Sequence, residues 1–364
     1  MVVRILRDLV AIPSVSSLSN VPMVNYALSF LKPPEWDIRR FPYTDAAGTA
    51  KVNIVAITRS AKRAELALVC HTDTVPFDVD WANAVDPVIR GGKLYGRGSC
   101  DVKGYLACVL AAISASDLKR LRKPLAVVLT ADEEIGCVGA KFLAKKRAVR
   151  ARYTIIGEPT GLRPVRAGKG YGLAEIIVRG KEAHSAFPAE GKSAIFAAAR
   201  IVTRLEGVAK KLASRKNRSF DPPYTTLNVG LIRGGTAKNI VAGECRITVE
   251  WRPVPGQDPA WAAELIREAL HGFDATLQVR RSDPPFEPAA TSQLSRLMES
   301  ISGNRSTTVS FGTEAAHLDT RGEETVVFGP GDMTVAHKTG EFVPVAALHR
   351  CVTYLQSAIQ ELCY

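Results

Sequence analysis

Short apolar runs separated by helix-forming segments constrain the fold of this chain most strongly. The runs at 64–70, 124–130, 153–157 and 324–328 have the length and composition of strands, and helical patterns occupy 104–115, 141–147 and 345–359. Strands that are apolar along their whole length are buried on both faces, as in a parallel sheet covered by helices on each side. The sequence therefore predicts an α/β domain with a central, mostly parallel sheet flanked by helices.

The middle of the chain follows a different pattern. Strands are predicted at 172–179, 225–232, 245–251 and 275–281, and helices at 193–205 and 259–270. This βαββαβ order is typical of a small α+β sandwich. We therefore expect an inserted domain over 168–281 and a larger, discontinuous domain over 1–167 and 282–364. Two domains suit a chain of 364 residues.

The net charge of +12 narrows the choice of partners. Basic stretches at 119–123, 141–152 and 210–218 carry no interleaved aromatic residues, and no nucleic-acid-binding motif is present, so nucleic acid is not the expected partner. A positive surface can instead attract small anions such as acylated amino acids, which keep a free carboxylate. No apolar run approaches the roughly 18 residues that a membrane-spanning helix needs.

The N-terminus and the cysteines bear on the compartment. Arg4, Arg7 and Asp8 interrupt the apolar pattern of the first residues, which favours an amphipathic helix over a secretory signal. The seven cysteines are odd in number and contain no C-x-x-C pair. Reduced thiols in a cytoplasmic protein are the simpler interpretation.

Potential metal ligands and acids follow each predicted strand of the larger domain. His71 and Asp73 follow the first strand, Glu133 and Glu134 the second, and Glu158 the third, while His337 lies in the loop after the fourth. A further acid, Asp101, lies in the glycine-rich segment GRGSCDVKG just before a predicted helix. Because the carboxyl ends of such strands meet at one edge of an open sheet, we expect these side chains to converge there.

Five of these side chains form a mixed nitrogen and oxygen ligand set: His71, Asp101, Glu134, Glu158 and His337. Such a set suits Zn²⁺, or alternatively Co²⁺, and is too large for one tetrahedral ion. Two divalent ions could polarise a carbonyl group and activate a water molecule. Each residue alone also has an ordinary structural interpretation, such as a helix cap, a solvated turn or an Asx turn. The coincidence of all five favours a metal site.

Several motifs resemble those of the M20 family of dinuclear zinc peptidases and deacylases. They are HTDTVP, GRGSCDVKG, DEEIG, IIGEPT and AHKTGEF. Further segments, PVRAGKG, TLNVGLIRGG, WRPVPG, FGTEA and GPGDMTVAHK, are similar to those of one deacetylase subgroup in that family. The resemblance covers nearly the whole chain. It implies a hydrolase of N-acyl amino acids whose inserted domain acts as a lid and joins two copies in a homodimer.

The resemblance also implies roles for the residues at the sheet edge. His71 and Glu158 would complete the shell of one ion, Glu134 and His337 that of the other, and Asp101 would bridge the two. Asp73 would orient the His71 imidazole. Glu133 would be the general base that takes a proton from water and delivers it to the leaving amine.

A second group of residues resembles the parts of the family site that bind substrate. His184 would stabilise the oxyanion, often from the partner subunit, and the substrate carboxylate would be held by Arg252, Asn239, Gly312 and Thr313. We also hypothesise that Glu314 neutralises a substrate ammonium group. Alternatively, His184 is an ordinary loop histidine and Arg252 pairs with an acid of its own domain.

The sequence leaves three other functions open: hydrolysis of a different N-acyl amino acid, hydrolysis of a dipeptide, and a non-catalytic protein of the same fold. The same site could serve a different N-acyl amino acid or a dipeptide, because pocket shape decides specificity. Glu250 and Trp251 before Arg252 also depart from the family pattern, as does the Lys-Thr-Gly-Glu segment after His337, and these departures affect substrate identity more than chemistry. A protein that kept the fold without catalysis is a further class, which Glu133 beside the ligands argues against.

Overall fold

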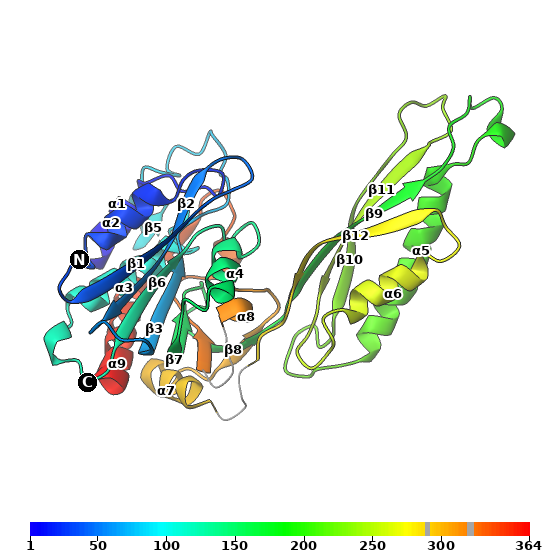
Figure 1. Ribbon diagram of the computed structural model, residues 1–364. Helices are drawn as coiled ribbons and strands as arrows, with labels where there is room; N and C mark the ends of the chain where they lie inside the picture. The colour runs from blue at the N-terminus through cyan, green and yellow to red at the C-terminus, as the bar shows by residue number, and fades with distance from the viewer. Residues whose placement is uncertain (288–291, 319–323) are drawn as a thin grey trace. The chain divides into compact units, whose positions relative to one another are not determined.

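Two compact units make up the chain, each with its own sheet (Figure 1). A computed structural model describes residues 1–287, 292–318 and 324–364. The larger unit comprises Met1–Arg166, Pro288–Thr307 and Thr313–Tyr364, and the smaller unit comprises Ala167–Glu287 and Thr308–Gly312. The smaller unit is therefore an insertion in the sequence of the larger one.

The main sheet has the strand order β1-β2-β6-β3-β7-β14-β8-β13. Its strands are β1 (Trp36–Thr44), β2 (Ala50–Thr58), β3 (Ala64–His71), β6 (Leu125–Thr130), β7 (Ala151–Ile156), β8 (Val165–Gly168), β13 (Thr307–Val309) and β14 (Glu324–Val327). The four central strands, β6, β3, β7 and β14, are mutually parallel, whereas β1, β2 and β8 pair antiparallel. The α/β fold with a mostly parallel sheet is thus confirmed.

Helices cover both faces of this sheet. They are α1 (Val2–Val10), α2 (Val21–Leu28), α3 (Lys103–Ser114), α4 (Val138–Lys145), α7 (Gln293–Ser302), α8 (Ala315–Leu318) and α9 (Val345–Cys363). Helices α1, α3 and α9 pack together over β3, and their apolar side chains form one continuous core with alternate residues of the strands. Helix α4 contacts α8 and β2. α3 is buried on nearly every side, which explains its small apolar residues.

A small second sheet in the larger unit joins distant parts of the sequence. It has the order β15-β5-β4, formed by β4 (Val88–Arg90), β5 (Lys93–Tyr95) and β15 (Phe342–Pro344). β15 runs antiparallel to β5, with Phe342 opposite Tyr95. This pairing places the segment after His337 beside the loop that carries Asp101.

The smaller unit is an antiparallel sheet with two helices on one face. Its elements in sequence are β9 (Tyr171–Arg179), α5 (Ala194–Ser214), β10 (Thr226–Gly234), β11 (Glu244–Arg252), α6 (Trp261–Ala269) and β12 (Ala275–Asp283). The strand order is β10-β11-β9-β12. Trp251 lies opposite Gly172, and a Cβ on that glycine would come within 1.9 Å of the indole ring. The predicted βαββαβ order is confirmed.

Three further observations complete the description. No disulfide links the seven cysteines, all of which are buried. Among the helices of the described residues, none has the length and apolar character needed to span a membrane. The three-stranded sheet and the β1–β2 pair were not predicted, since the strands of the former are only three residues long and β1 carries several charged side chains.

Candidate metal centre

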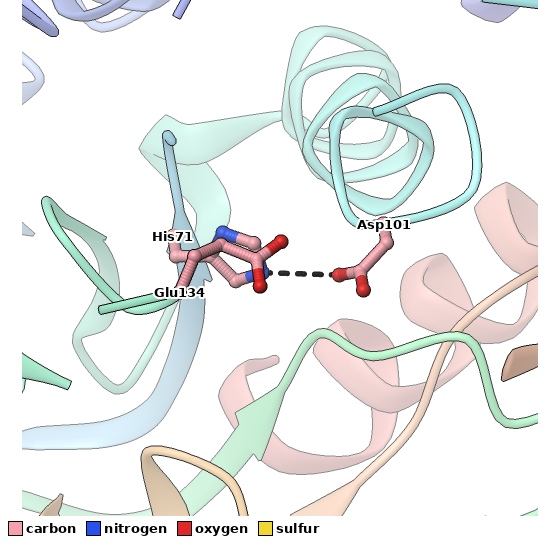
Figure 2. A group of neighbouring side chains, drawn as sticks. All are labelled: His71, Asp101 and Glu134. Carbon is pink, nitrogen blue, oxygen red and sulfur yellow. Dashed lines mark hydrogen bonds and ion pairs between the residues drawn. The ribbon is translucent and has the colours of Figure 1, made fainter. Parts of the chain in front are cut away.

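Side chains from three separate segments meet at the carboxyl edge of the main sheet (Figure 2). His71 is the last residue of β3, Glu134 lies in the turn after the neighbouring strand β6, and Asp101 lies just before α3. One ligand atom from each of these three residues lies within 4.8 Å of the other two. Ligand atoms that share one zinc ion at about 2.0–2.2 Å lie roughly 3–4 Å apart, so this spacing suits a metal ion.

The two oxygens of Asp101 face different histidines. Oδ1 lies 3.2 Å from Nε2 of His71, and Oδ2 lies 3.1 Å from Nε2 of His337. His337 also lies 3.1 Å from Oε2 of Glu134. A carboxylate that offers one oxygen to each of two ligand groups has the arrangement that a bridging ligand requires.

Glu158 lies in the same buried region, directly after Gly157 at the end of β7. A Cβ at Gly157 would come within 2.0 Å of the Tyr105 ring, so only glycine lets the chain pass here and bring Glu158 to the sheet edge. Burial raises the pKa of Glu158 well above its usual value, and the negative charges of Asp101 and Glu133 raise it further. The charge of Asp101 therefore acts on Glu158, but Glu158 is not part of the group of His71, Asp101 and Glu134 whose ligand atoms lie within 4.8 Å of one another.

The acids and imidazoles of this cluster perturb one another strongly. Burial and the charge of Asp101 raise the pKa of Glu134. Hydrogen bonds to Asp101 and Glu134 raise the pKa of His337 to about 10. Burial alone would raise the pKa of Asp101, but hydrogen bonds from His337 and His71 hold it below its usual range.

These observations fit a centre for divalent cations. Buried carboxylates compete here for two imidazoles, of which that of His71 is buried and that of His337 is about half exposed. Carboxylates with so little access to water are costly unless further positive charge is present. Two divalent ions would supply that charge, and the nitrogen and oxygen donors suit Zn²⁺ or Co²⁺ better than softer metals. The carboxylates and imidazoles of this cluster therefore suit the two divalent ions that the sequence predicts.

Asp73 contacts more of the site than its predicted role requires. Its carboxylate accepts hydrogen bonds from Ser16 Oγ at 2.7 Å and from the backbone N–H groups of Glu133 at 3.0 Å and Glu134 at 3.2 Å. Nδ1 of His71 lies 3.0 Å from the backbone oxygen of Asp73 and 3.6 Å from its Oδ1. Asp73 therefore holds the Glu133–Glu134 turn as well as the imidazole.

Glu133 precedes the candidate ligand Glu134 and is partly buried. Burial raises its pKa to about 7, and the nearby charges of Glu134, Asp73 and Asp101 contribute to that increase. The thiol of Cys137, at 3.3 Å, donates to Oε1 of Glu133. A carboxyl group with a pKa near neutrality can both take up and release a proton at physiological pH.

The predicted substrate residues of the larger unit are buried. Thr313 Oγ1 accepts from the backbone N–H of Ala315 at the start of α8. Glu314 has no exposed surface, and among the described residues no donor makes a hydrogen bond of normal geometry to either carboxylate oxygen. Burial raises the pKa of Glu314 to about 8. A substrate could reach Glu314 only if the surrounding residues moved.

The predicted substrate residues of the smaller unit are more accessible. His184, Asn239 and Gly312 are exposed or partly exposed. Nδ1 of His184 accepts from the backbone N–H of Ala186 at 3.1 Å. The guanidinium of Arg252 lies 4.2 Å from the centre of the Tyr171 ring and 3.6 Å from Glu250, an acid of its own unit.

Two buried ion pairs beside the site were not singled out from the sequence. Arg97 pairs with Glu341, and Lys51 pairs with Asp132, the residue before Glu133. Arg97 and Glu341 do lie in the motifs GRGSCDVKG and AHKTGEF, which was the available signal. No comparable signal marks Lys51.

Comparison with protein families decides the relationship that the motifs predicted. The model of peptidase family M20/M25/M40 matches residues 67–361. The chain belongs to this family. Membership makes it a hydrolase, in agreement with the expectation of an enzyme, and supports the expectation of divalent metal ions.

Relatives in this family include two deacetylases of similar length. An acetylornithine deacetylase from Myxococcus xanthus is 48% identical over 98% of this chain and 96% of its own length. Another acetylornithine deacetylase, from Proteus mirabilis, is 32% identical over 99% of this chain and 96% of its own length.

Solved structures of peptidases share the fold at lower identity. The aminopeptidase PepT of Bacillus cereus covers 99% of this chain and 98% of its own with a TM-score of 0.77 and 24% identity. Human carnosine dipeptidase 1 covers 99% of this chain and 96% of its own with a TM-score of 0.71 and 15% identity.

Proposed function

We propose that this protein is a metal-dependent amidohydrolase that converts N²-acetyl-L-ornithine to L-ornithine and acetate, a step of arginine biosynthesis. The full-length similarity to acetylornithine deacetylases supports the substrate. The observation that carries the chemistry is the position of Asp101, with one oxygen toward His71 and the other toward His337, beside Glu133.

The metal ions would be held by five side chains in the arrangement predicted from the sequence. We propose Zn²⁺ as the resident metal, with Co²⁺ as an alternative, bound by His71, Asp101, Glu134, Glu158 and His337. When bound, two such ions would polarise the acetyl carbonyl and lower the pKa of a water molecule. Asp73 would hold the His71 ring and the Glu133–Glu134 turn in fixed positions relative to each other.

Glu133 would move the proton in this reaction. It would take a proton from water as the water oxygen attacks the acetyl carbon. The carbon–nitrogen bond would then break, and Glu133 would deliver the same proton to the amine nitrogen of ornithine. Its pKa of about 7 in the metal-free protein matches a group that must act as base and then as acid.

Residues of the smaller unit would bind and activate the substrate. Because Nδ1 of His184 accepts a backbone hydrogen bond, the ring proton lies on Nε2, which is then able to donate to the carbonyl oxygen as it gains negative charge. Arg252 would bind the substrate carboxylate together with Asn239, Gly312 and Thr313. The weak contact between Arg252 and Glu250 leaves guanidinium donors for such an anion.

We further propose a cytoplasmic homodimer joined through the smaller unit. β10 is an edge strand of its sheet, and an edge strand of this kind can pair with a second copy. Large apolar side chains of this unit are exposed: Phe187, Ile195, Phe196, Leu231, Ile232 and Ile240. Exposed apolar side chains of this size favour a protein–protein interface in this unit.

A substrate panel tests the reaction. The purified protein is stripped with a chelator, reloaded with Zn²⁺ or Co²⁺, and assayed with acetylornithine, acetylcitrulline, succinyl-diaminopimelate, a neutral acetyl amino acid and a dipeptide. We expect chelator-sensitive acetate release, with the highest kcat/KM for acetylornithine. Preference for another substrate would contradict the proposed specificity. If none of the substrates is hydrolysed, the proposal that the protein is an amidohydrolase is contradicted. The same panel with Glu314→Gln tests whether Glu314 recognises the substrate ammonium, because unchanged discrimination would exclude that role.

A further inference from the structure

The carboxylate of Glu341 organises the loop that carries Asp101. Oε2 of Glu341 accepts from Nη1 of Arg97 at 2.6 Å and from the backbone N–H of Gly98 at 3.1 Å. Oε1 accepts from the backbone N–H groups of Cys100 at 2.9 Å and Asp101 at 3.0 Å. Glu341 is 1% exposed, so these four donors replace water completely around the charge.

Strand pairing explains why residues so distant in sequence meet here. β15 follows Glu341 and runs antiparallel to β5, which immediately precedes the loop from Gly96 to Asp101. The backbone N–H of Gly96 donates to the backbone oxygen of Glu341 at 3.1 Å. The small sheet therefore fixes Glu341 opposite the turn of the Asp101 loop.

The short segment from His337 to Glu341 contacts both the backbone N–H and the side chain of Asp101. Glu341 binds the backbone N–H of Asp101, and His337, four residues earlier, contacts its carboxylate at 3.1 Å. A shift of the Glu341 contact would therefore move Asp101 relative to both histidines. Ligand geometry in metal sites depends on such supporting contacts.

We propose that Glu341, neutralised by Arg97, is the positioning residue that aims Asp101 at both metal positions. This inference rests on the proposed role of Asp101 as the bridging ligand. Without the carboxylate, the N–H groups of Gly98, Cys100 and Asp101 lose their common acceptor, and the loop can turn the Asp101 side chain away from either histidine. Metal affinity and the geometry of the bound ions then change together.

A purely structural ion pair is the competing explanation. Arg97 is buried against the ring of Trp81, so loss of Glu341 alone leaves an unpaired buried charge that could unfold the protein for reasons unrelated to metal. The experiment therefore uses Glu341→Gln and the double variant Arg97→Gln with Glu341→Gln, which removes both charges at once.

Glu324→Gln is the matched control. Its carboxylate also accepts a backbone hydrogen bond, from Leu294 at 2.8 Å, together with one from the hydroxyl of Ser292 at 2.7 Å. It belongs to the same unit but contacts none of the proposed ligands. Any general effect of replacing a bound carboxylate by an amide should appear in this variant as well.

Metal titration of the chelator-stripped proteins provides the test. Zn²⁺ affinity is measured by competition with a chromophoric chelator, Co²⁺ coordination by visible absorption, and folding by circular dichroism. We expect about 10–100-fold weaker Zn²⁺ binding and an altered Co²⁺ spectrum for the folded double variant, with no change for Glu324→Gln.

Two results would overturn the inference. One is a double variant that binds both metals as the parent does, with the same cobalt spectrum. The other is an equal loss of affinity in Glu324→Gln. Neither readout involves acetylornithine, so failure of the positioning role is distinguishable from failure of the proposed substrate, which the parent protein tests in the substrate panel.

Discussion

Nζ of Lys51 lies 2.7 Å from Oδ1 of Asp132, and both side chains are 1% exposed. Lys51 also donates to the backbone oxygens of Ser16 and Leu18, and the hydroxyl of Tyr43 donates to Oδ2 of Asp132 at 2.7 Å. Asp132 has a φ of +58°, a conformation that a non-glycine residue adopts at some cost. The ion pair thus holds in place the residue from which the Glu133–Glu134 turn begins.

Replacement of Lys51 by methionine should destabilise the fold strongly. The variant leaves Asp132 buried without its cation, which typically costs about 3–5 kcal/mol. Urea unfolding of the metal-free protein measures the difference. Lys123→Met is the control, because Lys123 pairs with Glu65 at the surface and its loss should cost less than about 1 kcal/mol. Equal effects of the two substitutions would show that the buried pair is not important for stability.

Glu133→Gln should separate catalysis from metal binding. The amide cannot take a proton from water, so we expect kcat to fall about 10²–10⁴-fold or more while both ions stay bound. Asp101→Ala should instead lose metal, since it removes the group that faces both histidines. Metal content by mass spectrometry and initial rates on acetylornithine give the two readouts. A Glu133→Gln enzyme with nearly full activity would exclude the proposed mechanism.

The sequence predicted the larger features of the fold because they depend on local periodicity. Strands that are apolar over most of their length, such as β3 and β6, indicate burial on both faces. The βαββαβ order of the smaller unit follows from alternating patterns. The small sheet could not be predicted. Strands of three residues, such as β5 and β15, carry no measurable period, and their pairing joins segments about 250 residues apart in sequence.

Four of the candidate ligands, all except Asp101, were predictable for a related reason, because they follow strands that end at the same sheet edge. Asp101 was predictable from its glycine-rich motif before a helix. The groups that support them were not. Glu341 acts through backbone N–H groups, which every residue has and no sequence pattern distinguishes. Lys51 lies in an apolar strand, and its partner Asp132 is 81 residues away, so the ion pair exists only after the sheet has formed.

Uptake of metal should release protons. In the metal-free protein the pKa of His337 is raised to about 10, so its ring carries a proton at pH 7 that a metal ion must displace. We expect release of about one to two protons per protein at pH 7. The affinity for the metal should fall about tenfold for each pH unit by which the pH is lowered, for each proton displaced. Zinc titration in weak buffer with a pH indicator measures both quantities. Glu324→Gln serves as the control and should match the parent. Metal binding without proton release would contradict His337 as a ligand.

Glu314 should make the stability of the metal-free protein depend on pH. Its pKa is raised by burial from 4.5 to about 8, so the fold favours the protonated acid. Below pH 4.5 the folded and unfolded states are both protonated, and no stability is lost. As the pH rises from 4.5 to about 8, the unfolded state ionises first, and the free energy of unfolding decreases.

Glu314→Gln removes this dependence and tests it directly. Relative to the parent, the variant should gain about 3 kcal/mol between pH 5 and pH 8, whatever the pH-independent effect of the amide. Urea unfolding at the two pH values, with metal absent, gives the difference. The control is Glu299→Gln. The pKa of Glu299 is lowered, chiefly by its hydrogen bond with Ser306, so Glu299 is ionised in the folded state from pH 5 to pH 8. Its replacement should therefore give no comparable gain in stability. If Glu314→Gln and the parent lose stability in parallel as the pH rises, the Glu314 carboxyl group ionises freely, and its burial next to the metal centre is not maintained in solution.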